Sequence, residues 1–346
     1  MTPGHHILVR GTNWIGDSVM SLAALRELRR LYPDHHLSLC VTSWVSGLFE
    51  DQEIVDEVIP IHPSGSGWRD LIELRGRLRR AQTAILFQNA FRAAVEMVVS
   101  GVPERIGYAT DGRSLLLTHR ARPRIKALAK HQIYYYLDLL YQTGLSPHDY
   151  LQDPDFEPDI HLVASPKEIQ RADTLLQAAG PLPEGPRIIF NPGASYGPAK
   201  RWFTDRYAAL ADRLIDEFKA DVVLVGSRQE RALAQEIQSL TRHPLKILTG
   251  ETDLPSLMGL LSRADLFITN DSGPMHLAAA LDIPLIALFG STDEVATGPF
   301  NPKARVLHKH VECSPCLLRE CPIDLRCFSN IGVDEVYDAV RAVLQG

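Results

Sequence analysis

The sequence predicts an α/β protein made of two doubly wound domains, and three observations support this prediction. Short apolar runs of strand length alternate with amphipathic helical patterns along most of the chain. This alternation stops at a stretch rich in proline and aspartate, 147–158, and then restarts. The chain has 346 residues, which is more than a single domain of typical size requires.

The first half contains four apolar runs that are typical of strands buried in a parallel sheet. Between them lie helical patterns with apolar residues on one face, of which Leu22, Leu25 and Leu28 are the first example. The predicted strands are 6–10, 37–42, 55–61 and 84–87. The predicted helices begin near residue 17 and then cover 68–81, 91–100 and 130–143.

The second half repeats the pattern, and we expect Leu285 to Phe289 to close its sheet. The other predicted strands are 187–191, 221–225, 246–248 and 266–269, and the helices begin at 204 and 333 and cover 228–240 and 254–262. We expect an N-terminal Rossmann-like domain at 1–165 and a C-terminal Rossmann-like domain at 187–332. A linker helix with its connection, 166–186, would join them, and a final helix would cover 333–346. Open α/β sheets bind ligands at the carboxyl ends of their strands, so we expect one ligand per domain and chemistry in a shared crevice.

The composition is that of a globular protein, with 45% hydrophobic and 23% charged residues. The net charge of −6 disfavours a nucleic-acid-binding protein, which is normally basic. The N-terminal apolar run, Ile7 to Val9, is too short for a signal peptide, and the run Ile283 to Phe289 is too short to span a bilayer. We therefore expect a cytoplasmic protein whose composition is compatible with peripheral contact at a membrane surface.

The first candidate site is the turn after the first strand, from Gly11 to Asp17. This turn lacks both the spacing of a dinucleotide fingerprint and the ending of a P-loop, so a dehydrogenase is disfavoured. Asp17 stands where the next helix begins. It could be a helix cap, or its carboxylate could point into a cleft and act as a general base. The residues alone favour neither interpretation.

Two glycine-containing junctions in the second half are candidate phosphate sites. One, 191–202, contains Gly193, Ser195 and Lys200, so that small residues expose backbone amides beside a positive charge. Its alternative is a solvated loop, but its place after the first strand of the second domain favours diphosphate binding.

The other junction, 270–276, joins a predicted strand to a helix with a proline in its first turn. The amides of Ser272 and Gly273 would point at a phosphate, and the helix dipole would favour its negative charge. Asp271 could be only a helix cap and His276 only a buried helix residue. The recurrence of strand–glycine–helix junctions favours a nucleotide site.

Glu230 and Thr252 follow two further strands of the second domain. Glu230 could bind a ribose hydroxyl or could be a solvated helix residue, and Thr252 would lie beside it, near an adenine.

A basic stretch in the first domain contains Arg120, Arg122, Arg124 and Lys126. Such a run is usually a solvated loop. In an otherwise acidic protein it could instead hold an anionic ligand near a membrane.

Four of the five cysteines crowd into one segment, as Cys313, Cys316, Cys321 and Cys327. Four thiolates could form a tetrahedral zinc site. The irregular spacing favours a structural loop lined by thiols, with zinc as the lesser alternative.

At its three junctions the sequence resembles the ADP-heptose:lipopolysaccharide heptosyltransferases. The resemblance covers essentially the whole chain, and the cysteine segment is similar to that of the type II branch, which adds the second core heptose. The matching residues are 14–17, 191–202 and 270–277.

This resemblance implies a GT-B fold, in which two Rossmann-like domains face each other across a cleft. The donor would be ADP-L-glycero-β-D-manno-heptose in the second domain, and the acceptor would be the lipopolysaccharide inner core, bound by the first domain at the inner membrane. Asp17 would be the general base and Lys200 would stabilise the departing ADP. The donor-site residues would be Gly193, Ser195, Lys200, Glu230, Thr252, Asp271, Ser272, Gly273 and His276, and the acceptor-site candidates are Asn13, Trp14 and the four residues of the basic stretch.

The implied reaction inverts the anomeric centre and needs neither cofactor nor metal, and a monomer is expected. One enzyme alternative is a heptosyltransferase I, which acts on Kdo2-lipid A. A second is another GT-B nucleotide-sugar enzyme such as an epimerase, which would form no glycosidic bond. A non-enzymatic scaffold would bind the nucleotide sugar without turnover.

Overall fold

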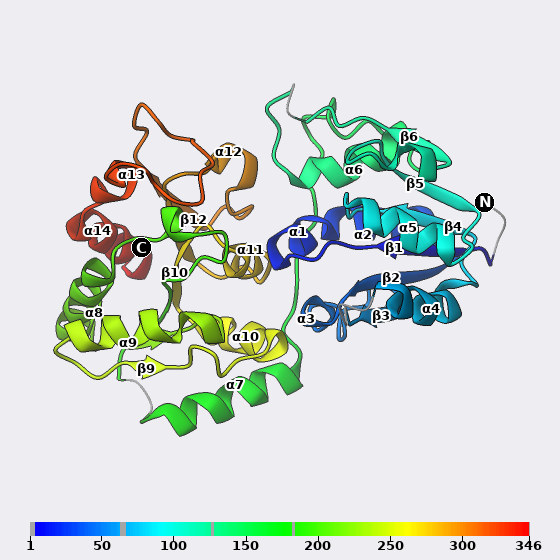
Figure 1. Cartoon of the computed structure of the whole chain (residues 1–346). Coiled ribbons are helices and arrows are strands. Elements are labelled where there is room, and N and C mark those ends of the chain that lie inside the picture. The colour runs from blue at the N-terminus through cyan, green and yellow to red at the C-terminus, as the bar shows by residue number, and fades with distance from the viewer. Residues whose placement is uncertain (1–3, 63–66, 126–127, 182–183, 346) are drawn as a thin grey trace. The chain divides into compact units, whose positions relative to one another are not determined.

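The computed structural model describes residues 4–62, 67–125, 128–181 and 184–345. The chain divides into two compact units, Met1–Ile160 and His161–Gly346. Each unit contains one six-stranded sheet flanked by helices (Figure 1). All strand pairs in both sheets are parallel. The prediction of two doubly wound, Rossmann-like α/β units is therefore confirmed.

The first unit has the strand order β3-β2-β1-β4-β5-β6. Its chain runs outward from β1 to β3, then returns past β1 and continues from β4 to β6, so the topological switch lies between β1 and β4. The strands are β1 (His6–Arg10), β2 (His36–Thr42), β3 (Glu57–Ile61), β4 (Thr83–Leu86), β5 (Glu104–Tyr108) and β6 (His119–Ala121). The helices are α1 (Ile15–Met20), α2 (Leu22–Leu31), α3 (Ser43–Ser46), α4 (Gly67–Leu78), α5 (Phe91–Val99), the 3₁₀ helix η1 (Arg113–Leu116) and α6 (Ile133–Gln142).

The second unit has the order β12-β11-β10-β7-β8-β9, with its switch between β7 and β10. The strands are β7 (Arg187–Asn191), β8 (Asp221–Leu224), β9 (Lys246–Ile247), β10 (Leu266–Asn270), β11 (Leu285–Phe289) and β12 (Ala304–His308). The α-helices are α7 (Pro166–Ala179), α8 (Thr204–Phe218), α9 (Arg231–Leu240), α10 (Leu254–Leu261), α11 (Gly273–Ala280), α12 (Glu294–Thr297), α13 (Arg326–Ser329) and α14 (Val333–Leu344). The 3₁₀ helices are η2 (Pro198–Lys200) and η3 (Arg228–Glu230).

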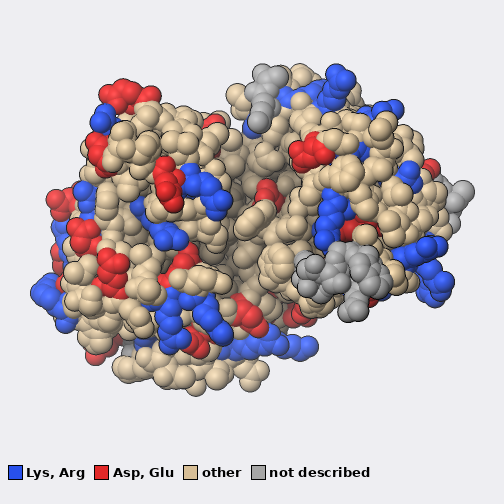
Figure 2. All heavy atoms as spheres, viewed as in Figure 1, with Lys and Arg blue, Asp and Glu red and all other residues tan. Residues whose placement is uncertain are grey.

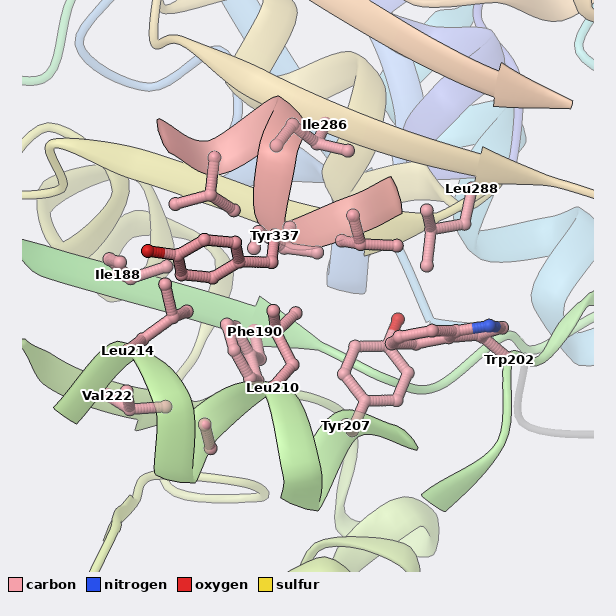
Figure 3. Packing of buried hydrophobic residues seen from close by; sticks show 14 of the residues in the cluster. Ile188, Phe190, Trp202, Tyr207, Leu210, Leu214, Val222, Ile286, Leu288 and Tyr337 are labelled. Carbon is pink, nitrogen blue, oxygen red and sulfur yellow. The ribbon is translucent and has the colours of Figure 1, made fainter. Parts of the chain in front are cut away.

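Helices α8 and α14 pack on one face of the second sheet (Figure 3). Alternate residues of β7, Ile188 and Phe190, point toward these helices and are fully buried. Trp202 lies in the same core, and its indole Nε1 donates a 3.0 Å hydrogen bond to the carbonyl of Ile331. Because Trp202 ends the loop that follows β7, this buried anchor fixes one end of a candidate phosphate loop.

Three strands were not predicted, namely β5, β6 and β12. Leu285 to Phe289 does not close the second sheet, because β12 pairs with β11 in parallel, with Leu285 opposite Ala304. Two of the three, β6 and β12, are edge strands that are short or partly exposed and carry arginines, so they lack a continuous apolar run.

The predicted linker helix is α7, and it belongs to the second unit. A capping box between Ser165 and Glu168 begins this helix. It packs closely on α10 at Gly259, where an added Cβ atom would lie 2.1 Å from the backbone oxygen of Glu168. The unit boundary follows Ile160, so the segment 166–179 is a docked helix rather than part of a connection between domains.

Charged side chains of both signs are interspersed over the surface visible in Figure 2. Among the described residues, no helix is both long enough and apolar enough to cross a membrane.

We predict that Gly259→Ala destabilises the second unit by about 1–3 kcal/mol, because the new methyl group meets the backbone of α7 and must push the helices apart. Thermal or urea unfolding measures this change. Gly76→Ala is the matched control, since Gly76 is also helical but has open space around its Cβ position. Equal stability of the two variants would contradict the close packing of α7 on α10.

Candidate functional site

The switch point of the second unit brings together the two candidate phosphate junctions. They follow β7 and β10, which are neighbours in the sheet, with Leu266 opposite Ile188. The side-chain amide of Asn270, which is fully buried, joins them. Its Nδ2 donates to the carbonyl of Pro192 at 2.7 Å, and its Oδ1 accepts from the backbone nitrogen of Trp202 at 3.1 Å. Asn270 was not among the predicted site residues, although it lies inside the predicted junction 270–276.

Asn191, at the end of β7, makes the complementary connection. Its Nδ2 donates to Thr269 Oγ1 at 3.1 Å and to Ser272 Oγ at 3.0 Å. Ser272 is the N-cap residue of α11, and its hydroxyl does not bond the helix backbone. The first amides of α11 therefore begin at the carboxyl edge of the sheet, where an anion could bind them.

Lys200 and Asp271 form an ion pair at this edge, with 2.5 Å between Nζ and Oδ2. Their side chains are only 15% and 6% exposed. Thr292, from the loop after β11, donates to the same carboxylate oxygen at 2.6 Å. Asp271 is not a helix cap, because its carboxylate is used in this network and Ser272 occupies the capping position. The pair holds a lysine cation at the switch point of the sheet.

Glu230 lies against the loop that contains Gly193. A Cβ atom at Gly193 would come within 2.0 Å of Glu230 Oε1, so only glycine allows this approach. Glu230 Oε2 accepts from the backbone nitrogen and the hydroxyl of Ser227, both at 2.8 Å, in a capping box. The structure thus brings Glu230 to the candidate phosphate loop rather than leaving it on a remote helix face.

The remaining predicted residues of this site differ in exposure. His276 is buried on α11 and Gly193 is buried in its loop, whereas Ser195 is exposed. Thr252 is half-buried just before α10. Gly273 begins α11.

In the first unit Asp17 is the third residue of α1, whose N-cap residue is Trp14. The capping interpretation of Asp17 is therefore wrong. Its carboxylate is half-buried, and Oδ1 accepts a 3.3 Å hydrogen bond from the hydroxyl of Tyr136 on α6. Burial and, after it, the Asp17 carboxylate hold the pKa of Tyr136 well above its ordinary value. Tyr136 is thus a neutral hydrogen-bond donor to Asp17 at physiological pH.

The loop after β4, on the other side of the switch point, is positioned by a buried arginine. Arg113 donates to the carbonyl of Gln88, and to the side-chain oxygen of Asn89 at 2.9 Å. Asn89 in turn donates to the hydroxyl of Tyr135 at 2.6 Å. Burial lowers the pKa of Arg113. No local pattern pointed to Arg113, because its partners come from other segments of the chain.

A cavity of about 240 Å³ lies within the first unit beside β1. Arg10, at the end of β1, lines it and forms a buried ion pair with Glu96 at 2.9 Å. Asn13 also lines it, and its carbonyl accepts from the indole of Trp44 at 2.8 Å. Trp14 is 66% exposed. The cavity combines an aromatic ring with hydrogen-bonding side chains, a combination suited to a polar ligand with hydroxyl groups.

The basic stretch is divided between two environments. Arg120 and Arg122 are exposed at or just beyond the edge strand β6, and Lys126 lies outside the described residues. Arg124 instead contacts Asp138 at 2.5 Å and Asp149 at 2.8 Å, and the hydrogen bonds to these carboxylates raise its pKa. Its contacts therefore give Arg124 a structural role inside the unit and lend no support to its predicted role in ligand binding.

The cysteines of the C-terminal segment are all free thiols, with Cys313 exposed and Cys327 buried. Among the described residues, the side chains that come close enough to share a metal ion are instead Glu294, His308 and His310. This group was not predicted, because its members come from α12, β12 and the segment after β12.

Two Rossmann-like units in one chain, the second with a basic glycine loop and a helix N-terminus at its switch point, are the architecture of the GT-B class of nucleotide-sugar enzymes. The sequence profile of glycosyltransferase family 9 (heptosyltransferase) matches residues 71–326. Lipopolysaccharide heptosyltransferase 2 of Salmonella typhimurium is 34% identical over 312 residues, which are 87% of each chain. This chain belongs to glycosyltransferase family 9, and the resemblance noted in the sequence is confirmed.

Two solved structures agree with this assignment. The ADP-heptose lipopolysaccharide heptosyltransferase II of Escherichia coli is 30% identical and superposes with a TM-score of 0.83 over 98% of each chain. A family 9 glycosyltransferase from Veillonella parvula has 21% identity and a TM-score of 0.85, over 100% of this chain and 99% of that one, which shows the likeness of fold.

We predict that Asn270→Ala lowers the free energy of unfolding by about 1–3 kcal/mol, because it leaves buried backbone groups of the β7 loop without partners. Chemical denaturation measures the change. Asn330→Ala, at an exposed asparagine of the same unit, serves as the control. If both variants unfold at the same denaturant concentration as the parent protein, Asn270 does not hold the two junctions together.

Proposed function

We propose that this protein transfers heptose from ADP-L-glycero-β-D-manno-heptose to the first heptose of the lipopolysaccharide inner core, heptosyl-Kdo2-lipid A. The observation that carries the proposal is the Lys200–Asp271 pair beside the start of α11, at the switch point of the second unit. Relatives named heptosyltransferase 2 support the choice of sugar and acceptor.

The second unit supplies the donor site in this proposal. The α11 amides and the loop after β7 would hold the two phosphates, with Lys200 as their cation. Glu230 would accept a hydrogen bond from a ribose hydroxyl with Oε1, since Oε2 is occupied by Ser227. Thr252 would lie toward the adenine, and His276 would complete the donor side.

The first unit supplies the acceptor site and the base. Asn13 and Trp14 would contact the acceptor sugar, and Arg120 and Arg122 would contact its anionic groups. Asp17 is the general base of the proposed reaction. The Tyr136 hydroxyl, held neutral, fixes the orientation of the Asp17 carboxylate through their hydrogen bond.

The chemistry is a single displacement. An acceptor hydroxyl attacks the anomeric carbon while Asp17 takes its proton, and the bond from that carbon to the phosphate oxygen breaks. Negative charge accumulates on the departing ADP, where Lys200 and the loop amides stabilise it. One displacement without a covalent sugar–enzyme intermediate inverts the anomeric centre. The proposal assigns no metal or cofactor to this step, and places a monomeric enzyme at the cytoplasmic face of the inner membrane.

We predict that the protein, given ADP-heptose, adds one heptose to an acceptor that already carries the first heptose and none to Kdo2-lipid A. Mass spectrometry of the products measures this. Addition to Kdo2-lipid A alone would indicate a heptosyltransferase I, and an altered nucleotide sugar without acceptor would indicate an epimerase. Donor binding with no product on any acceptor would indicate a scaffold.

We predict that Asp17→Asn lowers turnover by roughly 10²- to 10⁴-fold with unchanged affinity for ADP-heptose, because the amide cannot accept the proton but keeps the acceptor oxygen for Tyr136. Steady-state kinetics and donor titration measure the two quantities. Asp205→Asn is the matched control, since Asp205 also lies in the first turn of a helix but is exposed on α8. Turnover at the parent rate in Asp17→Asn would remove Asp17 from the chemistry.

A further inference from the structure

A cluster of two histidines and one glutamate lies at the edge of the second sheet. Glu294 is the first residue of α12, His308 ends β12, and His310 follows two residues later. One ligand atom from each lies within 4.8 Å of the other two. The imidazole rings of His308 and His310 are 4.4 Å apart. None of these residues belongs to the donor site proposed above.

The hydrogen bonds around His308 determine which of its ring nitrogens carries a proton. Ser314 Oγ lies 2.6 Å from the carbonyl oxygen of Gly290, and a carbonyl oxygen can only accept. The single hydroxyl proton of Ser314 therefore points to Gly290. The 2.8 Å contact between Ser314 Oγ and His308 Nε2 must then be donated by His308. Nε2 therefore carries a proton, so Nδ1 is the ring nitrogen left to bind a metal ion.

Nδ1 of His308 faces a carboxylate. Nδ1 of His308 lies 2.6 Å from Glu294 Oε2, and the His308 side chain is only 3% exposed. At this distance the two atoms share a proton, which a metal ion bound to both would replace. Glu294 Oε1 faces a third candidate ligand, His310 Nε2, at 3.3 Å.

We propose that Glu294, His308 and His310 form a binding site for a divalent transition metal of the zinc class. Two imidazoles and one carboxylate are a donor set that zinc takes in proteins, with water in the fourth position. Ligands of one tetrahedral zinc lie roughly 3.3 Å apart, so the cluster reaches this geometry by small side-chain movements. Ser314 and the carbonyl of Gly290 orient His308 through hydrogen bonds, as outer-shell groups do for histidines that bind metal ions.

His310 gives the ion a route of entry, because its side chain is 71% exposed. Binding displaces any proton held between His308 and Glu294, and joins α12 to the segment after β12. Glu294 lies two residues beyond Thr292 and is not among the residues assigned to the reaction. The proposed role of the metal is therefore structural.

The test uses the full chain, freed of metal by a chelator and kept reduced, and titrated with Co²⁺ as a spectroscopic probe and with Zn²⁺. We expect one equivalent of Co²⁺ with visible d–d absorption of a nitrogen- and oxygen-ligated ion and no thiolate charge-transfer band. We also expect Zn²⁺ to raise the melting temperature. His310→Ala and Glu294→Gln should each weaken binding at least roughly tenfold.

His243→Ala is the matched control, because His243 forms a similar pair with Asp216 elsewhere in the same unit, with 2.8 Å between Nε2 and Oδ1, and should bind the metal as the parent does. His310→Ala is the decisive variant, since its exposed side chain can be removed without disturbing the core. A thiolate band would show that the neighbouring cysteines bind the metal instead. Binding that survives His310→Ala and Glu294→Gln, or the absence of binding, would also overturn the proposal.

Discussion

The ion pair between Lys200 and Asp271 is the interaction on which the second unit's site depends. It joins the loop after β7 to the end of β10, and Thr292 extends it to the loop after β11. Two charges so far removed from water are stable only with good geometry and further hydrogen bonds, and loss of one partner of such a pair typically costs about 3–5 kcal/mol. The pair therefore fixes three loops before any ligand arrives. A diphosphate entering this site would meet a cation already in place, so that little reorganisation is needed.

The two units position their switch-point loops with different chemistry. The second uses neutral amides, since Asn270 and Asn191 bond backbone and hydroxyl groups across the switch. The first uses arginines: Arg113 holds the loop after β4, and Arg10 holds the turn after β1 through the carbonyl of Gly11 at 2.7 Å. A guanidinium has five donors, so a single buried arginine can satisfy several carbonyl groups of an irregular loop. In the second unit the positive charge of Lys200 lies beside these neutral amides, paired with Asp271.

The features that could be predicted are those that depend on residues close together in the sequence. Buried parallel strands are continuous apolar runs, and a strand–glycine–helix junction is visible in a dozen residues, so most strands of both sheets and the position of Asp17 could be predicted. The partners of these residues could not, because Tyr136 lies 119 positions from Asp17 and Asp271 lies 71 positions from Lys200. The edge strand β12 was not predicted, because a strand with solvent on one side does not need a continuous apolar run. The spacing of the cysteines suggested a thiol site. Glu294, His308 and His310 come close together through the pairing of β11 with β12, which the sequence does not reveal.

The loop after β11 connects the donor-side network to the histidine cluster. Thr292 bonds Asp271, and Asp293 caps α12 by accepting from Val295 at 2.9 Å, so that Glu294 begins a helix whose start is fixed. Glu294 then reaches His308 at the end of β12. Thr292 and Glu294 thus flank the residue that caps α12, so the contacts with Asp271 and with His308 both start from one short capped turn. A continuous series of contacts therefore runs from Lys200, in the loop after β7, through Asp271 and the turn before α12 to His308 on the outermost strand of the sheet.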